Sequence, residues 1–193
     1  MIILRHPRSH RPNMNQPRTA TPHAMRGLTL LEATMVMAIG LILGAIALPY
    51  MRKLSERQGA ISSANLLITH IAFARNHAVT QRRIAILCPS SDGNSCRADN
   101  NWSFGWLVMD SALNPTTTTS TRILMTAQLS ANTRVHIYSN KGRTRLRYLP
   151  DGRSSGANTS FRICTSGVML SKIVVSNGGR VRSEAAPVRT SCH

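Results

Sequence analysis

Apolar positions follow one another almost without interruption near the start of the chain. From Leu28 to Tyr50 the residues are mostly apolar, and Glu32 is the one acidic residue among them. At about 1.5 Å per helical residue, this run would span roughly 34 Å as a helix, which is enough to cross the ~30 Å hydrocarbon core of a membrane. The pattern therefore predicts a membrane-embedded helix over residues 28–50.

After Tyr50 the apolar positions recur every three or four residues, which is typical of an amphipathic helix that continues the first one. We expect this helix to end near Thr80 and to bury one face, made of Leu54, Ile61, Ala64, Ile68, Ile71 and Ala78. His70 and His77 lie two turns apart on it. With no carboxylate or third histidine nearby in the sequence, we interpret both as structural.

From Arg83 onward, short apolar runs alternate with turn residues, which is typical of antiparallel strands. The expected strands are Ile84–Cys88, Trp106–Asp110, Ile123–Leu129, Val135–Tyr138, Arg145–Leu149, Ser160–Cys164, Ile173–Ser176 and Val181–Glu184. Residues 177–179, Asn-Gly-Gly, are predicted to form a hairpin tip that needs a positive φ. Asn114, Pro115 and residues 116–119 indicate a loop. The fold class is therefore α+β, with a long amino-terminal helix under a head of antiparallel sheets.

A carboxylate inside a membrane helix costs about 2.5–3.5 kcal/mol unless it has a partner. Gly27 directly precedes the apolar run, basic residues flank it, and Glu32 is the fifth residue after the glycine. This arrangement resembles the type IV prepilin signal. The resemblance implies that a prepilin peptidase cuts after Gly27, that Leu28 becomes an N-methylated terminus, and that Glu32 pairs with the amino group of Leu28 of the same or a neighbouring subunit. The alternative is an ordinary membrane anchor or secretory signal.

These features divide the chain into a leader over residues 1–27, a helix over 28–80 that is apolar over 28–50, and a β-rich head over 81–193. The chain carries 24 Lys and Arg against 7 Asp and Glu, a formal charge of +17. Five of the arginines lie in the leader, so the processed chain retains about +12. Arginine outnumbers lysine, and its planar guanidinium suits phosphate, so the charge indicates a polyanionic partner.

Two arginine groups are candidate binding residues. Strand alternation would place Arg143, Arg145 and Arg147 on one face, where three like charges gain from a nearby anion. Arg180 and Arg182 form a similar pair directly after Gly179. We add Lys172 to the candidate set. The alternative is a solvated basic face that has no partner.

The chain contains four cysteines, Cys88, Cys96, Cys164 and Cys192, without the spacing of a zinc site. Behind a membrane signal, they are typical of two disulfides in an oxidising compartment. Proximity in the sequence favours Cys88 with Cys96 and Cys164 with Cys192, although three connectivities and free thiols remain open.

Several motifs in this order resemble the FimT/GspH minor pilins and pseudopilins. They are Cys-Pro-Ser-Ser-Asp-Gly at 88–93, Trp-Ser-Phe-Gly-Trp at 102–106, Pro-Asp-Gly-Arg at 150–153, Phe-Arg-Ile-Cys at 161–164 and Gly-Arg-Val-Arg at 179–182. In FimT proteins of competent bacteria, a Gly-Arg-x-Arg motif contacts DNA during uptake. The resemblance implies a minor pilin, anchored in the inner membrane by one helix and then built into a pilus with other pilin subunits. Its head, in the periplasm or outside the cell, would bind double-stranded DNA independently of sequence for natural transformation.

Two other functions remain open: a pseudopilin of type II secretion, and a purely structural minor pilin without DNA binding. We expect no enzymatic activity, because the sequence contains no nucleophile elbow, phosphate loop or paired carboxylates. No cofactor and no metal are expected.

Overall fold

The computed structural model describes residues 29–111, 122–130, 134–186 and 190–192. The predicted processing residues Gly27 and Leu28 lie outside the described residues, as does the expected loop over residues 114–119. The chain divides into two units, one up to Gly44 and one from Ala45, and each is described by itself. The elements in order are α1 (Leu30–Gln81), β1 (Ile84–Pro89), β2 (Gly105–Ser111), β3 (Arg122–Gln128), β4 (Val135–Ser139), β5 (Leu146–Tyr148), β6 (Thr159–Thr165), β7 (Val168–Val175) and β8 (Val181–Ala185).

The first unit contains the start of α1. The Thr29 hydroxyl accepts a hydrogen bond of 3.3 Å from the Glu32 backbone N–H, which caps the helix. The large apolar side chains that follow are exposed, Leu41 for example to 75%. By length and composition, α1 can cross a membrane. Exposed apolar surface of this extent is stable only in lipid or against other chains.

In the second unit, α1 buries a stripe rich in small residues, and the predicted face agrees with it in part: Ala64, Ile71 and Ala78 are buried, and Ile68 is half-buried. Its buried side chains are Ala60, Ser63, Ala64, Leu67, His70, Ile71, Ala74 and Ala78. Leu54 and Ile61, predicted to be buried, are 46% and 45% exposed. The prediction was wrong there because alanine, which is weakly hydrophobic, occupies the face that approaches the sheets most closely.

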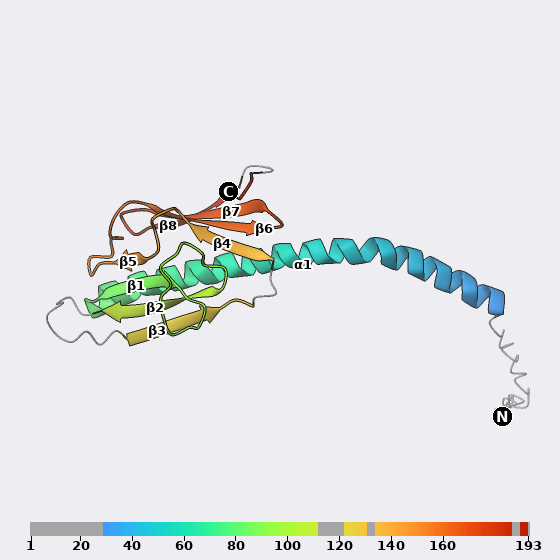
Figure 1. The fold of residues 1–193 in the computed structure, drawn as a ribbon, viewed down its shortest axis with the longest axis horizontal. Helices are drawn as coiled ribbons and strands as arrows, with labels where there is room; N and C mark the ends of the chain where they lie inside the picture. The colour runs from blue at the N-terminus through green and yellow to red at the C-terminus, as the bar shows by residue number, and fades with distance from the viewer. Residues whose placement is uncertain (1–28, 112–121, 131–133, 187–189, 193) are drawn as a thin grey trace, which may run out of the picture. The chain divides into compact units, whose positions relative to one another are not determined.

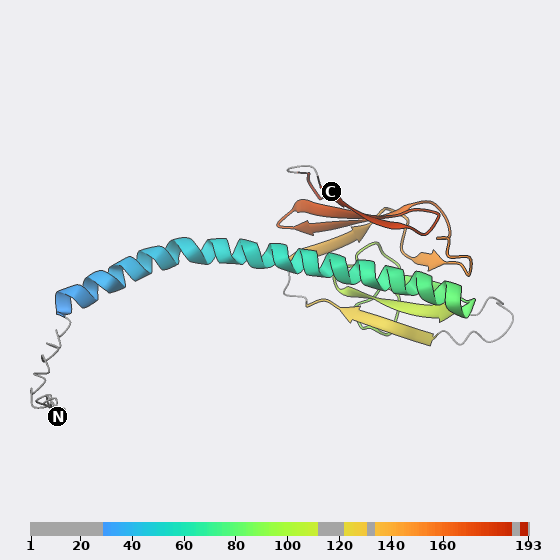
Figure 2. The same ribbon diagram turned by 180° about the vertical axis from the view of Figure 1, so that it is seen from behind.

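The head consists of two antiparallel four-stranded sheets (Figures 1 and 2). The first sheet has the order β3-β2-β1-β5, and the second has the order β4-β6-β7-β8. Side chains from both sheets and from α1 form one core, in which Trp102, Trp106, Tyr148 and Phe161 are the largest fully buried residues. All eight predicted strands are present, and β7 begins five residues earlier than expected.

Two disulfides fix loops of the head. The structure joins Cys88 to Cys96 and Cys164 to Cys192, with Cα–Cα distances of 5.5 and 6.2 Å. These are the pairs that proximity in the sequence favoured. The second disulfide holds the end of the chain against the second sheet, where Ser191 bridges Val168.

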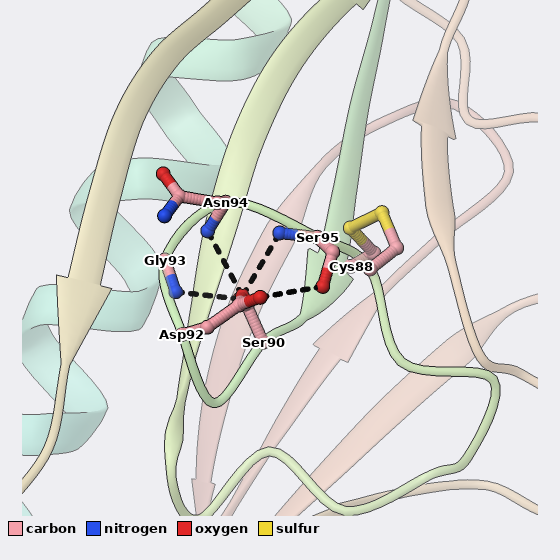
Figure 3. Close-up of a disulfide and its surroundings, with 7 residues drawn as sticks. Cys88, Ser90, Asp92, Gly93, Asn94 and Ser95 are labelled. Carbon is pink, nitrogen blue, oxygen red and sulfur yellow. Dashed lines mark hydrogen bonds between the residues drawn. A yellow bond between two sulfur atoms is a disulfide. The ribbon is translucent and has the colours of Figure 1, made fainter.

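The loop after Cys88 is organised by one carboxylate (Figure 3). Asp92 accepts hydrogen bonds from the backbone N–H groups of Asn94 and Ser95 and from the hydroxyls of Ser90 and Ser95. These donors, the backbone N–H of Ser95 first, hold the pKa of Asp92 well below its usual range. The Asp92 carboxylate is therefore bound by donors of its own loop.

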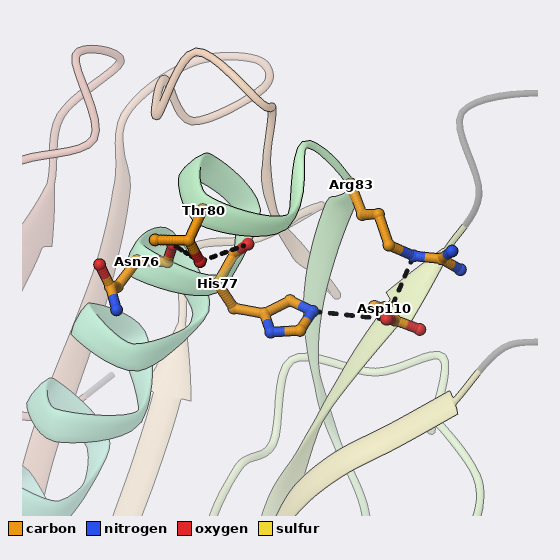
Figure 4. Close-up of polar contacts among 5 residues, drawn as sticks. All are labelled: Asn76, His77, Thr80, Arg83 and Asp110. Atoms are coloured by element: carbon orange, nitrogen blue, oxygen red, sulfur yellow. Dashed lines mark hydrogen bonds and ion pairs between the residues drawn. The ribbon is translucent and has the colours of Figure 1, made fainter.

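Both histidines of the second half of α1 contact polar partners. The Trp106 indole N–H donates to Nδ1 of the buried His70 over 3.0 Å. At the end of α1, the His77 Nε2 and Arg83 Nε lie 3.4 and 3.2 Å from Asp110 (Figure 4). The sequence showed no carboxylate near His77, since Asp110 comes from β2. These contacts agree with a structural role for both histidines.

Candidate nucleic-acid interface

The turn between β7 and β8 places the Arg180 and Arg182 pair. The Gly179 N–H donates to the Ser176 carbonyl over 2.8 Å, and the Ser176 N–H donates to the Arg180 carbonyl over 3.0 Å. Gly179 has a φ of +77°, and a Cβ at this position would clash with the carbonyl oxygen of Gly152. Glycine is therefore required by both conformation and space, as the Asn-Gly-Gly pattern predicted for the backbone.

Arg75 of α1 donates hydrogen bonds to this turn and to the neighbouring Gly152. The Arg75 guanidinium donates to the Gly152 carbonyl over 3.0 Å and to the Gly178 carbonyl over 3.2 Å. Tyr148 donates its hydroxyl to the Gly179 carbonyl over 3.3 Å, and burial raises its pKa to about 12. Two residues far apart in the sequence, Arg75 and Tyr148, thus hold the backbone of the turn that carries Arg180.

Arg180 and Arg182 line one hollow of about 310 Å³. Both are exposed, and the Arg180 guanidinium makes no hydrogen bond or ion pair with another described residue. Arg180 precedes β8, so only Arg182 belongs to the strand, where it pairs with Val174. Arg182 Nε donates to Glu184 over 2.7 Å. Glu184 orients Arg182 and reduces the local positive charge.

The outer face of the second sheet extends this basic surface. Lys172 pairs with Glu184 on one side and with Arg162 on the other. Arg162 and Lys172 are half-buried and without side-chain partners in the part of the chain that the structure describes. Lys172 belongs to the residues predicted from the sequence, whereas Arg162 does not, although the alternation in Phe161–Cys164 places it on the outer face.

The three-arginine row is only partly formed. In β5, Leu146 and Tyr148 are buried while Arg147 and the preceding Arg145 are exposed, as alternation predicted. Arg143 does not belong to this row, because its N–H donates to the Asn140 carbonyl in a turn before the strand. Its half-buried guanidinium lies against Gly156.

Arg147 of the arginine row and Arg182 of the arginine pair belong to different sheets, and one segment connects these two parts of the head. Arg147 stands in the first sheet beside β1, and Arg182 stands in the second. The backbone N–H of Ser155 donates to the Arg147 carbonyl over 2.9 Å, and the backbone N–H of Ser154 donates to the Asn177 carbonyl over 2.9 Å. The segment Ser154–Ser155 therefore links β5 to the Gly179 turn, although no contact joins the two arginine groups directly among the described residues.

Most described carboxylates of the second unit have basic partners. Arg97, Arg134 and Arg153 pair with Asp99, Glu56 and Asp151 respectively. The backbone N–H and guanidinium of Arg153 hold the pKa of Asp151 below its usual range. The arginines that remain without a carboxylate therefore determine the sign of the surface potential.

The chain resembles a known family in sequence and solved structures in fold. The family model described as type II transport protein GspH matches residues 63–179. Two solved structures of the type IV minor pilin FimU from Pseudomonas aeruginosa share the fold at 20% identity. One covers 68% of this chain and 98% of its own, with a TM-score of 0.51, and the other covers 72% and 99%, with a TM-score of 0.55. No curated protein sequence matches the chain.

The structural likeness confirms the predicted fold class, a long amino-terminal helix with a head of two antiparallel sheets. Proteins with this fold and from this family are structural, in keeping with the expectation of no enzymatic activity. The family match covers more than half of the chain and ends at Gly179, just before the arginine pair. The chain therefore belongs to the GspH family and is a minor pilin or pseudopilin of the type IV pilin kind.

Proposed function

We propose that this protein is a minor type IV pilin whose basic head binds extracellular double-stranded DNA during natural transformation. Contacts would be made mainly to phosphates, so binding would be insensitive to sequence and sensitive to salt. The binding residues are Arg180 and Arg182 on the Gly179 turn, with Lys172 on the same sheet face. Arg145 and Arg147 are candidates for a second contact, and Arg143 is a weaker one.

The observation that carries this proposal is the state of Arg180. Its guanidinium is exposed and without a described partner, on a turn held by Arg75, Tyr148 and Gly152. Because the backbone of the turn is held, binding orders little more than the Arg180 side chain, whose free planar donors fit phosphate oxygens. An arginine needed only for folding would be expected to contact the rest of the head.

The amino-terminal part of the proposal follows from the prepilin pattern. We propose that a prepilin peptidase cuts after Gly27 and that Leu28 is then methylated. The apolar part of α1 would hold the protein in the inner membrane as a single span until assembly. It would then pack against other pilin subunits in the pilus, with the head in the periplasm or outside the cell.

A pseudopilin of type II secretion is the second candidate, because the matching family is described as a type II transport protein. In that case, or in a purely structural minor pilin, the head would have no affinity for DNA. Deleting the gene would then impair secretion or pilus number, whereas our proposal predicts loss of DNA uptake.

The direct test is fluorescence anisotropy with a labelled duplex and the full chain in detergent micelles. Arg180→Ala with Arg182→Ala should weaken binding by at least about tenfold, since two charge-assisted contacts are lost. The matched control is Arg57→Ala with Arg122→Ala, which removes two exposed arginines of α1 and β3. Circular dichroism must show that all variants are folded. Equal affinities for the two double variants would reject the proposed site.

A further inference from the structure

A groove lies on the outer face of the second sheet, at the edge opposite to β8. Its volume is about 580 Å³, which is within the range of ligand pockets, and its lining includes His136, Tyr138, Lys141, Arg162 and the Cys164–Cys192 disulfide. β4 and β8 are separated by three strand spacings, roughly 14 Å. The groove is therefore distinct from the Arg180 hollow but shares its sheet face.

Two aromatic rings form one side of the groove. His136 and Tyr138 occupy alternate positions of β4, whose other positions, Val135, Ile137 and Ser139, are buried. The two ring planes are 14° apart, and their centroids are separated by 6.3 Å. His136 is exposed and Tyr138 is half-buried, so both offer ring surface that the core does not use.

Positive charge lies directly beside these rings. Arg162 is the cross-strand partner of Tyr138, and Lys141 follows β4 in the next turn. Neither side chain has a hydrogen bond or ion pair within the described ranges, and no carboxylate is among the described residues that line the groove. Aromatic faces next to unpaired cations fit a ligand that is both planar and anionic, such as a nucleotide.

The geometry points to unpaired nucleotides rather than to a duplex. In a duplex the base faces are covered by their neighbours, whereas a single strand can place its bases on aromatic side chains. We propose that this groove binds single-stranded DNA, with bases stacked on His136 and Tyr138 and phosphates held by Arg162 and Lys141. The inference rests on the proposed DNA-binding function but uses different residues.

Lys172 connects the two sites. It lies between Arg162 of the groove and Glu184, the partner of Arg182, in one cross-strand row. The row places two neighbouring cations, Arg162 on β6 and Lys172 on β7, between the groove and the Arg182–Glu184 pair of β8, so a DNA end held by the Arg180 pair has cations between it and the groove. The Cys164–Cys192 disulfide and the Cys192 N–H bond to the Gly167 carbonyl, 3.3 Å long, fix the opposite wall.

The test uses the full chain in detergent micelles with two labelled probes, an oligothymidylate of about 12 nucleotides and a duplex of the same length. Tyr138→Leu should weaken binding of the single strand by roughly tenfold, since stacking contributes about 1–3 kcal/mol per base. Tyr138→Trp, which keeps an aromatic ring, should retain the single-strand affinity. Phe104→Leu, which removes an exposed aromatic ring outside the groove, should change neither affinity by more than about twofold.

The results separate this inference from the proposed function. If Tyr138→Leu leaves the single-strand affinity unchanged, or if Tyr138→Trp loses it equally, the groove is not a stacking site. The Arg180 and Arg182 variants would still decide duplex binding. Conversely, a wild-type chain that binds only the single strand, and loses it with Tyr138→Leu, supports the groove and rejects the duplex proposal.

Discussion

At the residue scale, the arginine pair depends on Gly179. The sequence indicated the backbone conformation of this glycine but not which residues surround it. The Asn-Gly-Gly pattern predicted the positive φ of Gly179. It did not show that Gly152 and Arg75 would lie against this glycine, because they approach from segments 27 and 104 residues earlier in the chain. Glu184 was detectable, since it lies two positions after Arg182 on the same strand face.

A pair of glycines separates backbone conformation from crowding. Gly142 and Gly179 have φ angles of +76° and +77°, but nothing lies within 4 Å of a Cβ at Gly142. Gly142→Ala should therefore lower the free energy of unfolding by only about 1 kcal/mol. Gly179→Ala should lower it considerably more, because the methyl group meets the Gly152 carbonyl. Urea unfolding measures both losses in the free energy of unfolding. Equal losses would show that the turn shifts to accommodate the added methyl group.

At the scale of elements, turn residues predicted the strands better than apolar periodicity predicted the buried face of α1. Seven strands begin within one residue of the expected position. β7 begins at Val168, because Ser166 and Gly167 form a left-handed turn that the sequence analysis did not identify. The buried face of α1 was predicted only in part: Ala64, Ile71 and Ala78 are buried, whereas Leu54 and Ile61 are exposed.

The contact between α1 and β2 should make the head sensitive to mild acid. Burial lowers the pKa of His70 below the 6.5 of an exposed histidine, and its Nδ1 accepts the Trp106 hydrogen bond. Below about pH 6.5 the unfolded chain binds the proton more readily than the folded one. The free energy of unfolding should therefore fall as the pH falls from about 6.5 to 5, by at most about 1.4 kcal/mol per pH unit.

His70→Gln provides the control, since its amide oxygen can accept the Trp106 hydrogen bond without titrating. Carboxylates with a lowered pKa, such as Asp151, titrate below this window. Chemical denaturation at several pH values should give a flatter curve for His70→Gln than for the wild type. Parallel curves would mean that His70 takes up its proton without cost in the folded head.

At the scale of the whole molecule, the amino-terminal pattern predicts how the protein matures. If Gly27 is the cleavage site, mass spectrometry of protein from the host should find a chain that starts at a methylated Leu28. Glu32→Ala should be cleaved normally but fail to enter filaments, since its carboxylate would pair with the amino group of Leu28. A different mature start, or normal assembly of Glu32→Ala, would contradict this account.

The family and fold could be recognised from short motifs, because these contain the turns, tryptophans and cysteines that build the head. The function was harder to predict, since a basic face forms from residues that the two sheets bring together. Arg162 and the rings of His136 and Tyr138 form one site only because neighbouring strands bring them together. By contrast, Arg143 leaves its predicted row because a local turn ends before β5.

The central claim is that the Arg180 turn contacts DNA phosphates, and the salt dependence of binding tests it most directly. The logarithm of duplex affinity should be measured against the logarithm of salt concentration for the wild type, the Arg180 and Arg182 double variant, and the Arg57 and Arg122 control. If each arginine of the pair contacts one phosphate, the double variant should lower the magnitude of the slope by about two, for unrelated duplex sequences alike. The control should keep the wild-type slope. Identical slopes for the wild type and the Arg180 and Arg182 variant would contradict the account.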